Sequence, residues 1–206
     1  MMTANRTIQG FTLVEAVVVV GLLLLIVGGL VTVLLTGQAS YLSADAYVQV
    51  QQEARRALDS VVRELRESGT VSCGTAAVTA SCTGTQLNFQ VARNYDPTGG
   101  AIVWGSDNAD NEYVHYAVVA AADGTSQLIR YRDAAAAGAP PGTCTPPACR
   151  VLANYVDPAT TVFAWDAAAA NRTVTITLEI EYQNARLPGR SQTTGPLTSR
   201  VRLRNA

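Results

Sequence analysis

The sequence predicts an α+β protein: a long N-terminal α-helix, transmembrane in its first half and amphipathic in its second, packed on a C-terminal antiparallel β-sheet domain. Three observations predict this class. Residues 11–36 are almost wholly apolar, residues 38–67 carry apolar side chains at helical spacing, and several segments beyond residue 70 alternate in the manner of strands. The 206 residues suffice for one globular domain with an appendage.

The first ten residues, MMTANRTIQG, are polar and contain one basic side chain, Arg6. The apolar run FTLVEAVVVVGLLLLIVGGLVTVLLT follows at residues 11–36. As a helix it is about 39 Å long, which exceeds a hydrocarbon core of about 30 Å. Because positive charge precedes the span, we expect a single-pass protein of the inner membrane with a cytoplasmic N-terminus and a periplasmic or extracellular C-terminal domain.

Other interpretations of this run explain fewer of its features. A secretory signal peptide cleaved after Ala39 would normally have an apolar core of only about 7–15 residues. An ordinary signal anchor leaves Glu15 without a role, although a carboxylate at the centre of a membrane helix costs roughly 2.5–3.5 kcal/mol and normally has a partner. The length of the run also disfavours a buried helix of a soluble core.

The string G-F-T-L-V-E, from Gly10 to Glu15, resembles the cleavage motif of type IV prepilins. The resemblance implies that residues 1–10 are a leader that prepilin peptidase removes between Gly10 and Phe11. It also implies N-methylation of the new terminus at Phe11. Glu15 would then be the fifth residue of the mature chain, where in this family it neutralises the terminal amine of a neighbouring filament subunit.

The amphipathic half of the helix is expected over residues 37–69. Its predicted apolar stripe comprises Tyr47, Ala54 and Val61, with Gln51, Leu58 and Leu65 interleaved. The pair Ser68–Gly69 predicts where the helix stops. Residues 52–69, QEARRALDSVVRELRESG, resemble the end of this helix in J-type pseudopilins and W-type minor pilins. Thr32 stands where many major pilins carry proline, which favours a minor subunit.

Residues 70–206 are expected to form a β-rich periplasmic or extracellular domain. The predicted strands are residues 86–92, 112–120, 126–132, 172–183 and 198–204. The pair Asp123–Gly124 predicts a hairpin turn. Gly/Pro-rich loops are expected at 96–100, 138–147 and 188–196.

All four cysteines lie beyond the apolar run, as expected in an oxidising compartment: Cys73, Cys82, Cys144 and Cys149. Three pairings are possible. The local pairs Cys73–Cys82 and Cys144–Cys149 are favoured because each closes a short loop, and four free thiols are the alternative. The spacings do not match a zinc site.

An acidic loop offers the sole candidate for a metal. Asp107, Asp110 and Glu112 supply oxygen ligands of the kind that Ca²⁺ prefers, although their spacing is not that of an EF-hand. A solvated turn is the simpler interpretation, so no cofactor is expected. The lone histidine, His115, is expected half-buried in a strand. No catalytic motif accompanies it, and no catalytic residue or enzyme activity is predicted.

The chain is therefore expected to be a minor pilin or pseudopilin of a type IV pilus or a type II secretion-like filament, placed near the tip. Its expected partners are prepilin peptidase, the inner membrane and other subunits that contact its apolar helix. The net charge of −1 gives no basic field for nucleic acid. Two alternatives remain: a competence (DNA-uptake) pseudopilin, and a membrane-anchored or secreted enzyme that uses the β-rich domain.

Overall fold

The computed structural model describes residues 12–74, 81–104, 113–133, 138–168, 172–183 and 191–203. Within them one helix, α1 (Leu13–Arg66), precedes twelve strands, all paired antiparallel. The chain divides into two compact units, Met1–Ala44 and Asp45–Ala206, and α1 contributes to both. The predicted α+β class, with a long N-terminal helix and antiparallel sheets, is confirmed.

The helix begins at an N-cap residue, Thr12, within the sequence T-L-V-E that is typical of a capping box. The Oγ1 atom of Thr12 accepts a hydrogen bond from the backbone N–H of Glu15 at 3.3 Å, and the Thr12 carbonyl accepts the first helical bond from Ala16 at 3.1 Å. A threonine followed three residues later by glutamate is a common helix start, because both side chains can bond free backbone N–H groups of the first turn. The helix was expected from residue 11, and the capping threonine explains why its first turn starts at Leu13.

The second unit buries one face of α1. The buried residues are Ala46, Val50, Ala54, Ala57, Leu58, Val61 and Leu65. The predicted stripe is wrong at Tyr47, which is 43 % exposed. At 3.6 residues per turn the buried face passes through Ala46 and Val50 instead, and Gln51 lies at its margin, where it donates a hydrogen bond to the Thr194 carbonyl at 3.3 Å.

The helix ends at Arg66, and the chain turns at once into β1 (Ser68–Cys73). Ser68 Oγ donates to the Leu65 carbonyl at 2.8 Å, which satisfies one of the free carbonyls of the last turn. The predicted stop at Ser68–Gly69 therefore marks the boundary, but these residues open a strand rather than a loop.

The first sheet has the strand order β1-β3-β5-β6-β7, with β4 paired to the far part of β3. Its further strands are β3 (Gln86–Asp96), β4 (Ala101–Trp104), β5 (Tyr113–Ala120), β6 (Ser126–Asp133) and β7 (Cys149–Ala153). The expected turn at Asp123–Gly124 joins β5 to β6. Gly124 has a φ of +82°, and Asp123 Oδ1 accepts hydrogen bonds from the N–H and the hydroxyl of Thr125 at 3.0 and 2.6 Å.

The second sheet has the order β12-β9-β8-β2, and a separate pair joins β10 to β11. Its strands are β2 (Cys82–Gly84), β8 (Val162–Asp166), β9 (Thr173–Leu178) and β12 (Leu197–Arg202), and the separate pair comprises β10 (Glu181–Gln183) and β11 (Ser191–Thr193). The single strand expected at 172–183 is divided at Glu179, because its carbonyl accepts a hydrogen bond from Asp157 outside the sheet at 2.9 Å. Strand β11 lies inside the segment expected as a loop at 188–196.

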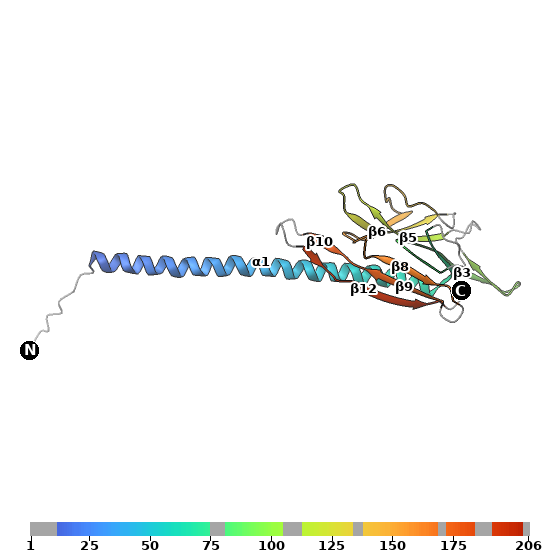
Figure 1. The fold of residues 1–206 in the computed structure, drawn as a ribbon, viewed down its shortest axis with the longest axis horizontal. Coiled ribbons are helices and arrows are strands. Elements are labelled where there is room, and N and C mark those ends of the chain that lie inside the picture. Colours follow the sequence, from blue (N-terminus) through green and yellow to red (C-terminus); the bar gives the residue numbers. More distant parts are fainter. Residues whose placement is uncertain are drawn as a thin grey trace, which may run out of the picture. The chain divides into compact units, whose positions relative to one another are not determined.

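Figure 1 shows the second half of α1 running alongside the strands. One core of buried side chains joins this part of the helix to both sheets. Ala54, Val61 and Leu65 of α1 meet Leu87 and Phe89 of the first sheet. The second sheet adds Phe163, Val174, Ile176 and Leu178 from its inward face.

Candidate functional site

The N-terminal part of α1 presents an apolar surface that nothing in its own unit covers. Seventeen large apolar side chains between Leu13 and Leu35 are each at least 45 % exposed. This segment is long and apolar enough to cross a membrane. A monomeric protein in water rarely exposes an apolar patch of this extent, so the segment requires lipid or other apolar helices around it.

Hydroxyl groups in this segment satisfy themselves within the helix. Thr32 Oγ1 donates to the Gly28 carbonyl at 2.8 Å, Thr36 Oγ1 to the Thr32 carbonyl at 2.9 Å, and Ser40 Oγ to the Thr36 carbonyl at 3.0 Å. Each bond spans four residues, so the three side chains follow one another along one face. A hydroxyl bonded in this way carries a smaller penalty in hydrocarbon than an unbonded one.

Glu15 is the one acidic residue in this apolar segment, and its side chain is exposed. It occupies the third position of the helix, where the partial positive charge of the helix terminus stabilises a carboxylate. The predicted cleavage residues Gly10 and Phe11 lie outside the described residues. Glu15 thus contributes its backbone N–H to the cap at Thr12, and the pairing of its carboxylate with a neighbouring subunit stays a prediction.

The middle of α1 also has a shallow apolar hollow beside Gly37. Its lining residues all belong to the first unit: Val33, Leu34, Gly37, Gln38, Tyr41 and Leu42. Because Gly37 has no side chain, a neighbouring helix could approach the α1 backbone closely at this point.

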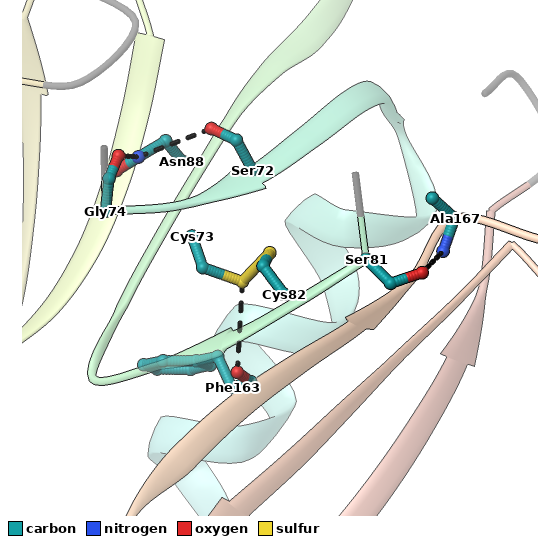
Figure 2. The surroundings of a disulfide bond; sticks show 8 residues. All are labelled: Ser72, Cys73, Gly74, Ser81, Cys82, Asn88, Phe163 and Ala167. Carbon is teal, nitrogen blue, oxygen red and sulfur yellow. Dashed lines mark hydrogen bonds between the residues drawn. A yellow bond between two sulfur atoms is a disulfide. The ribbon is translucent and has the colours of Figure 1, made fainter. Parts of the chain in front are cut away.

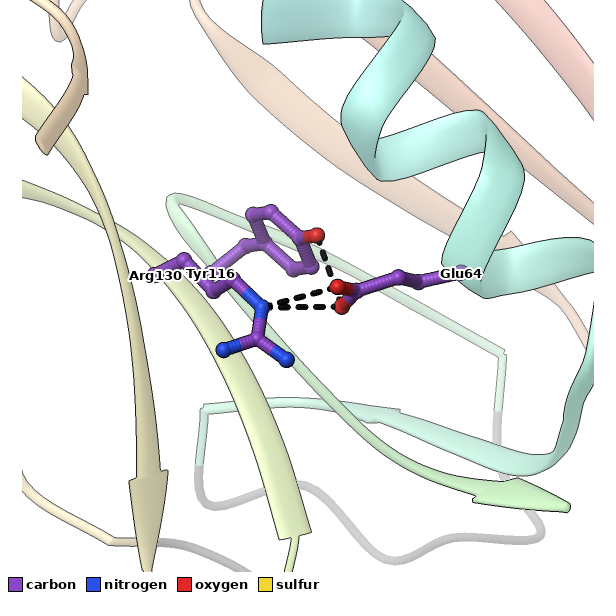
Figure 3. Close-up of polar contacts among 3 residues, drawn as sticks. All are labelled: Glu64, Tyr116 and Arg130. Carbon is purple, nitrogen blue, oxygen red and sulfur yellow. Dashed lines mark hydrogen bonds and ion pairs between the residues drawn. The ribbon is translucent and has the colours of Figure 1, made fainter. Parts of the chain in front are cut away.

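An ion pair fastens the far end of α1 to the first sheet (Figure 3). Arg130 Nε of β6 donates to both carboxylate oxygens of Glu64, at 2.9 and 3.0 Å, and the Tyr116 hydroxyl of β5 donates to Glu64 Oε2 at 2.9 Å. The Arg130 and Glu64 side chains are only 17 % and 25 % exposed. Such a partly buried, hydrogen-bonded pair orients the helix against the sheet.

These contacts shift two pKa values. Burial raises the pKa of Tyr116 above its ordinary value of 10.0, and the negative charge of Glu64 raises it further. Burial acts to lower the pKa of Arg130, but the hydrogen bond and the charge of Glu64 outweigh it and the net pKa is raised. Both groups therefore keep their protons at neutral pH.

A second polar contact lies further back along α1. Glu53 Oε1 accepts hydrogen bonds from the backbone N–H of Asn154 at 2.7 Å and from its side-chain amide at 3.1 Å. The contact shows that this carboxylate also ties α1 to the segment that follows β7.

His115 lies in β5, as expected, but it is fully buried rather than half-buried. Its Nδ1 lies 2.8 Å from Asn88 Oδ1, and its ring stacks on Tyr131 with the centroids 4.7 Å apart. Ser72, Asn88, His115 and Tyr131 follow one another across β1, β3, β5 and β6. Ser72 and His115 are thus two strands apart, about 10 Å, and form no nucleophile–base pair.

The polar residues around His115 also hold a loop against the first sheet. The Tyr131 hydroxyl donates to the Gly138 carbonyl at 2.8 Å, and Gln86 Nε2 donates to that carbonyl at 2.8 Å. Burial raises the pKa of Tyr131 to about 12, with a further contribution from the charge of Asp133. The buried position and these bonds give the cluster around His115 a structural role.

The two favoured cysteine pairings are both present. Cys73–Cys82 joins β1 of the first sheet to β2 of the second, and Cys144–Cys149 closes the loop before β7. Figure 2 shows the first bond, with Cys73 Sγ 3.9 Å from the Phe163 carbonyl oxygen. No free cysteine remains.

The calcium candidates Asp107, Asp110 and Glu112 lie outside the described residues, so that site stays a prediction. Within the described part of the chain, no group of three or more His, Cys, Asp or Glu side chains is arranged to hold a metal ion.

Sequence reasoning missed two features of the helix. The hydroxyls at Thr32, Thr36 and Ser40 recur every four residues at the end of the apolar run and just beyond it, and this spacing alone would have revealed their shared face. The partners of Glu64 could not be found in the same way, because Tyr116 and Arg130 come from distant strands whose register only the folded sheet defines.

The comparisons with known proteins produced no match, whether to a family model, to a curated protein or to a solved structure. The function must therefore be inferred from the residues of this chain and their arrangement.

Proposed function

We propose that this protein is a minor pilin or pseudopilin, a subunit that prepilin peptidase processes and that enters a filament through its apolar helix. The observation that carries the proposal is the position of one carboxylate. Glu15 stands in the first turn of an exposed apolar helix that is long enough to span a membrane, directly after the sequence G-F-T-L-V. Cleavage after Gly10 would put a new amine four residues before this carboxylate.

The physical chemistry of this arrangement favours assembly. An ionised carboxylate and an ammonium group are both costly in hydrocarbon, and pairing between neighbouring subunits reduces both costs. Such a pair also fixes the axial position of one helix against the next. The apolar side chains from Leu13 to Leu35 would exchange lipid contacts for contacts with neighbouring helices, and the hollow beside Gly37 would admit one of them.

The proposal of a minor subunit rests on Thr32 and on the resemblance of residues 52–69. Thr32 retains the backbone N–H that a proline would lack, and its hydroxyl bonds the Gly28 carbonyl at 2.8 Å. The helix is therefore unbroken at the position where many major pilins carry proline. The proposed single-pass topology, with the β-rich unit outside the inner membrane, is supported by Arg6 before the span and by the two disulfides beyond it.

Three substitutions at Glu15 test whether its charge or its helix-capping capacity matters. Glutamine retains capping capacity because it replaces glutamate in capping boxes, but it carries no charge. We expect Glu15→Gln and Glu15→Ala to reduce incorporation into sheared filaments by at least about tenfold, whereas Glu15→Asp keeps part of it. The assay is quantitative immunoblotting of filament and membrane fractions from cells that express the full chain.

Thr12→Ala serves as the matched control, because it removes the cap at Glu15 without changing any charge. It should assemble close to the wild-type level. If Glu15→Gln assembles normally while Thr12→Ala does not, Glu15 acts through helix capping and the charge-pairing proposal fails. Normal incorporation of Glu15→Ala would contradict the filament proposal as a whole.

A further inference from the structure

A polar groove lies on the face of the second sheet that points away from the core. Along β8 and β9 the inward residues Phe163, Trp165 and Val174 are buried in the core, so their neighbours Ala164 and Thr175 point to the other face. The cavity has a volume of about 430 Å³, within the range of small-molecule sites. It is lined by Ser81, Cys82, Thr83, Ala164, Trp165, Asp166, Thr173, Thr175 and Arg200.

The strand register explains why this face is hollow. Thr83, Ala164, Thr175 and Arg200 are direct neighbours across β2, β8, β9 and β12. Alanine is the smallest of the four, so the face dips at Ala164 between the hydroxyls on either side. Strands about 4.8 Å apart set the spacing between these side chains.

The wall formed by β2 is held in a fixed position. Cys82 is bonded to Cys73 of the first sheet, and Ser81 Oγ accepts a hydrogen bond from the Ala167 N–H at 2.9 Å (Figure 2). Strand β2 has only three residues, and these two bonds secure it against the edge of β8. The groove is therefore preorganised, which lowers the entropic cost of binding.

The charges of the lining are balanced. Arg200 is exposed, and its Nε donates a long hydrogen bond to Thr175 Oγ1 at 3.4 Å. No carboxylate within the described residues forms an ion pair with it. Asp166 supplies one negative charge to the same groove, and the remaining polar groups of the lining are the hydroxyls of Ser81 and three threonines.

We propose that this groove binds a saccharide. A sugar hydroxyl both donates and accepts, so one hydroxyl of a saccharide can accept from Arg200 and another can donate to Asp166, while the threonine hydroxyls bond the others. A simple anion would be repelled by Asp166 and a simple cation by Arg200. An apolar ligand would displace water from both charged groups and offer them no hydrogen bond in return. The inference does not depend on the proposed assembly function.

The test is saturation-transfer NMR on the full chain in lipid nanodiscs. Glycoside detergents are avoided because their head groups are themselves saccharides. The probes are the methyl glycosides of glucose, galactose, mannose and N-acetylglucosamine. We expect saturation transfer to the ring protons of at least one probe, with an affinity that falls by roughly tenfold or more in Arg200→Ala, since a lost hydrogen bond to a charged group has an effect of this size.

Two further variants separate binding from folding. Ala164→Leu fills the floor of the groove from the outer face and should abolish the signal, and Thr175→Val removes one hydroxyl with little change of shape and should weaken it. Arg202→Ala is the matched control, since Arg202 is exposed on the same strand but does not line the groove. It should leave the affinity unchanged.

Several results would overturn the saccharide site. These are no transfer to any of the four probes, equal signals from Ala164→Leu and the wild type, or equal weakening by Arg200→Ala and Arg202→Ala. Displacement of the bound glycoside by inorganic phosphate or by a single-stranded oligonucleotide at low salt would identify an anion site instead. None of these outcomes depends on filament assembly, so the groove and the proposed function can fail separately.

Discussion

At the scale of single residues, a polar contact holds α1 against the first sheet, and one of its members is a tyrosine that can lose its proton. Tyr116 is fully buried, and its hydroxyl donates to Glu64, which also accepts from Arg130. Ionised Tyr116 would place a second negative charge beside the carboxylate. The position therefore favours the protonated phenol strongly, and folding stability should depend on pH in the alkaline range.

The sign of this dependence follows from the raised pKa of Tyr116. In the unfolded chain the phenol titrates near 10.0, and in the folded protein it titrates higher. Its contribution to stability is complete below pH 10.0 and is lost as the pH rises toward the folded-state pKa. Over this range the free energy of unfolding should fall by about 1.4 kcal/mol per pH unit for this group.

Tyr116→Phe should reduce that alkaline slope, although the variant is less stable at neutral pH by about 0.5–1.5 kcal/mol for the lost hydrogen bond. Urea unfolding of the full chain, followed by tryptophan fluorescence between pH 8 and about pH 11, measures both effects. A slope identical to that of the wild type would show that Tyr116 does not titrate abnormally.

At the scale of elements, the backbone of Gly69 and the indole ring of Trp104 lie close together just after the helix, where the first sheet begins. A Cβ atom at Gly69 in β1 would lie 2.6 Å from Cη2 of Trp104 in β4. The indole ring therefore covers the backbone at the start of β1. Glycine is required at this position by contact with the ring.

Gly69→Ala should destabilise the protein by about 1–3 kcal/mol, because the added methyl group displaces the indole ring. In a Trp104→Ala background the same substitution should cost little. Urea unfolding of the four proteins in a double-mutant cycle measures this coupling. If Gly69→Ala costs the same in both backgrounds, the close approach to Trp104 is not the reason for glycine.

The strands also show where a local sequence pattern is enough to predict a strand. Strand β9 was found because Val174, Ile176 and Leu178 alternate with threonines, so one face is apolar and the other polar. Strand β2 has three residues and no such pattern, and β8 reads VFAWD, which is nearly continuous in apolar character. These strands form because of pairing with neighbours, which no local pattern reveals.

The same limit applies to the candidate sites. The disulfide pairs follow from short loops that the sequence displays directly. The polar groove depends on Ala164 lying between Thr83 and Thr175, and those three residues come from separate strands. The register between strands that are distant in sequence brings the groove residues together, and it also brings Tyr116 and Arg130 to Glu64.

At the scale of the whole molecule, the protein consists of an apolar helical unit and a disulfide-linked β-rich unit. The first unit exposes a long apolar surface, which is unfavourable in water, and the second unit has its own hydrophobic core. This division suits a protein that waits in a membrane and is later taken into a filament. An ordinary membrane anchor would show the same division. What distinguishes a pilin-like subunit from such an anchor is the chemistry of its N-terminus, which prepilin peptidase cleaves and methylates.

In the proposed function, the mature chain begins at Phe11 with a methylated amine. Intact-mass and N-terminal peptide mass spectrometry of the protein from cells that contain prepilin peptidase tests it directly. We predict an N-methylated Phe11 start, and an unprocessed chain in cells without the peptidase. A mature chain that starts at Ser40, or one that keeps Met1 or Met2 in the presence of the peptidase, would contradict the claim.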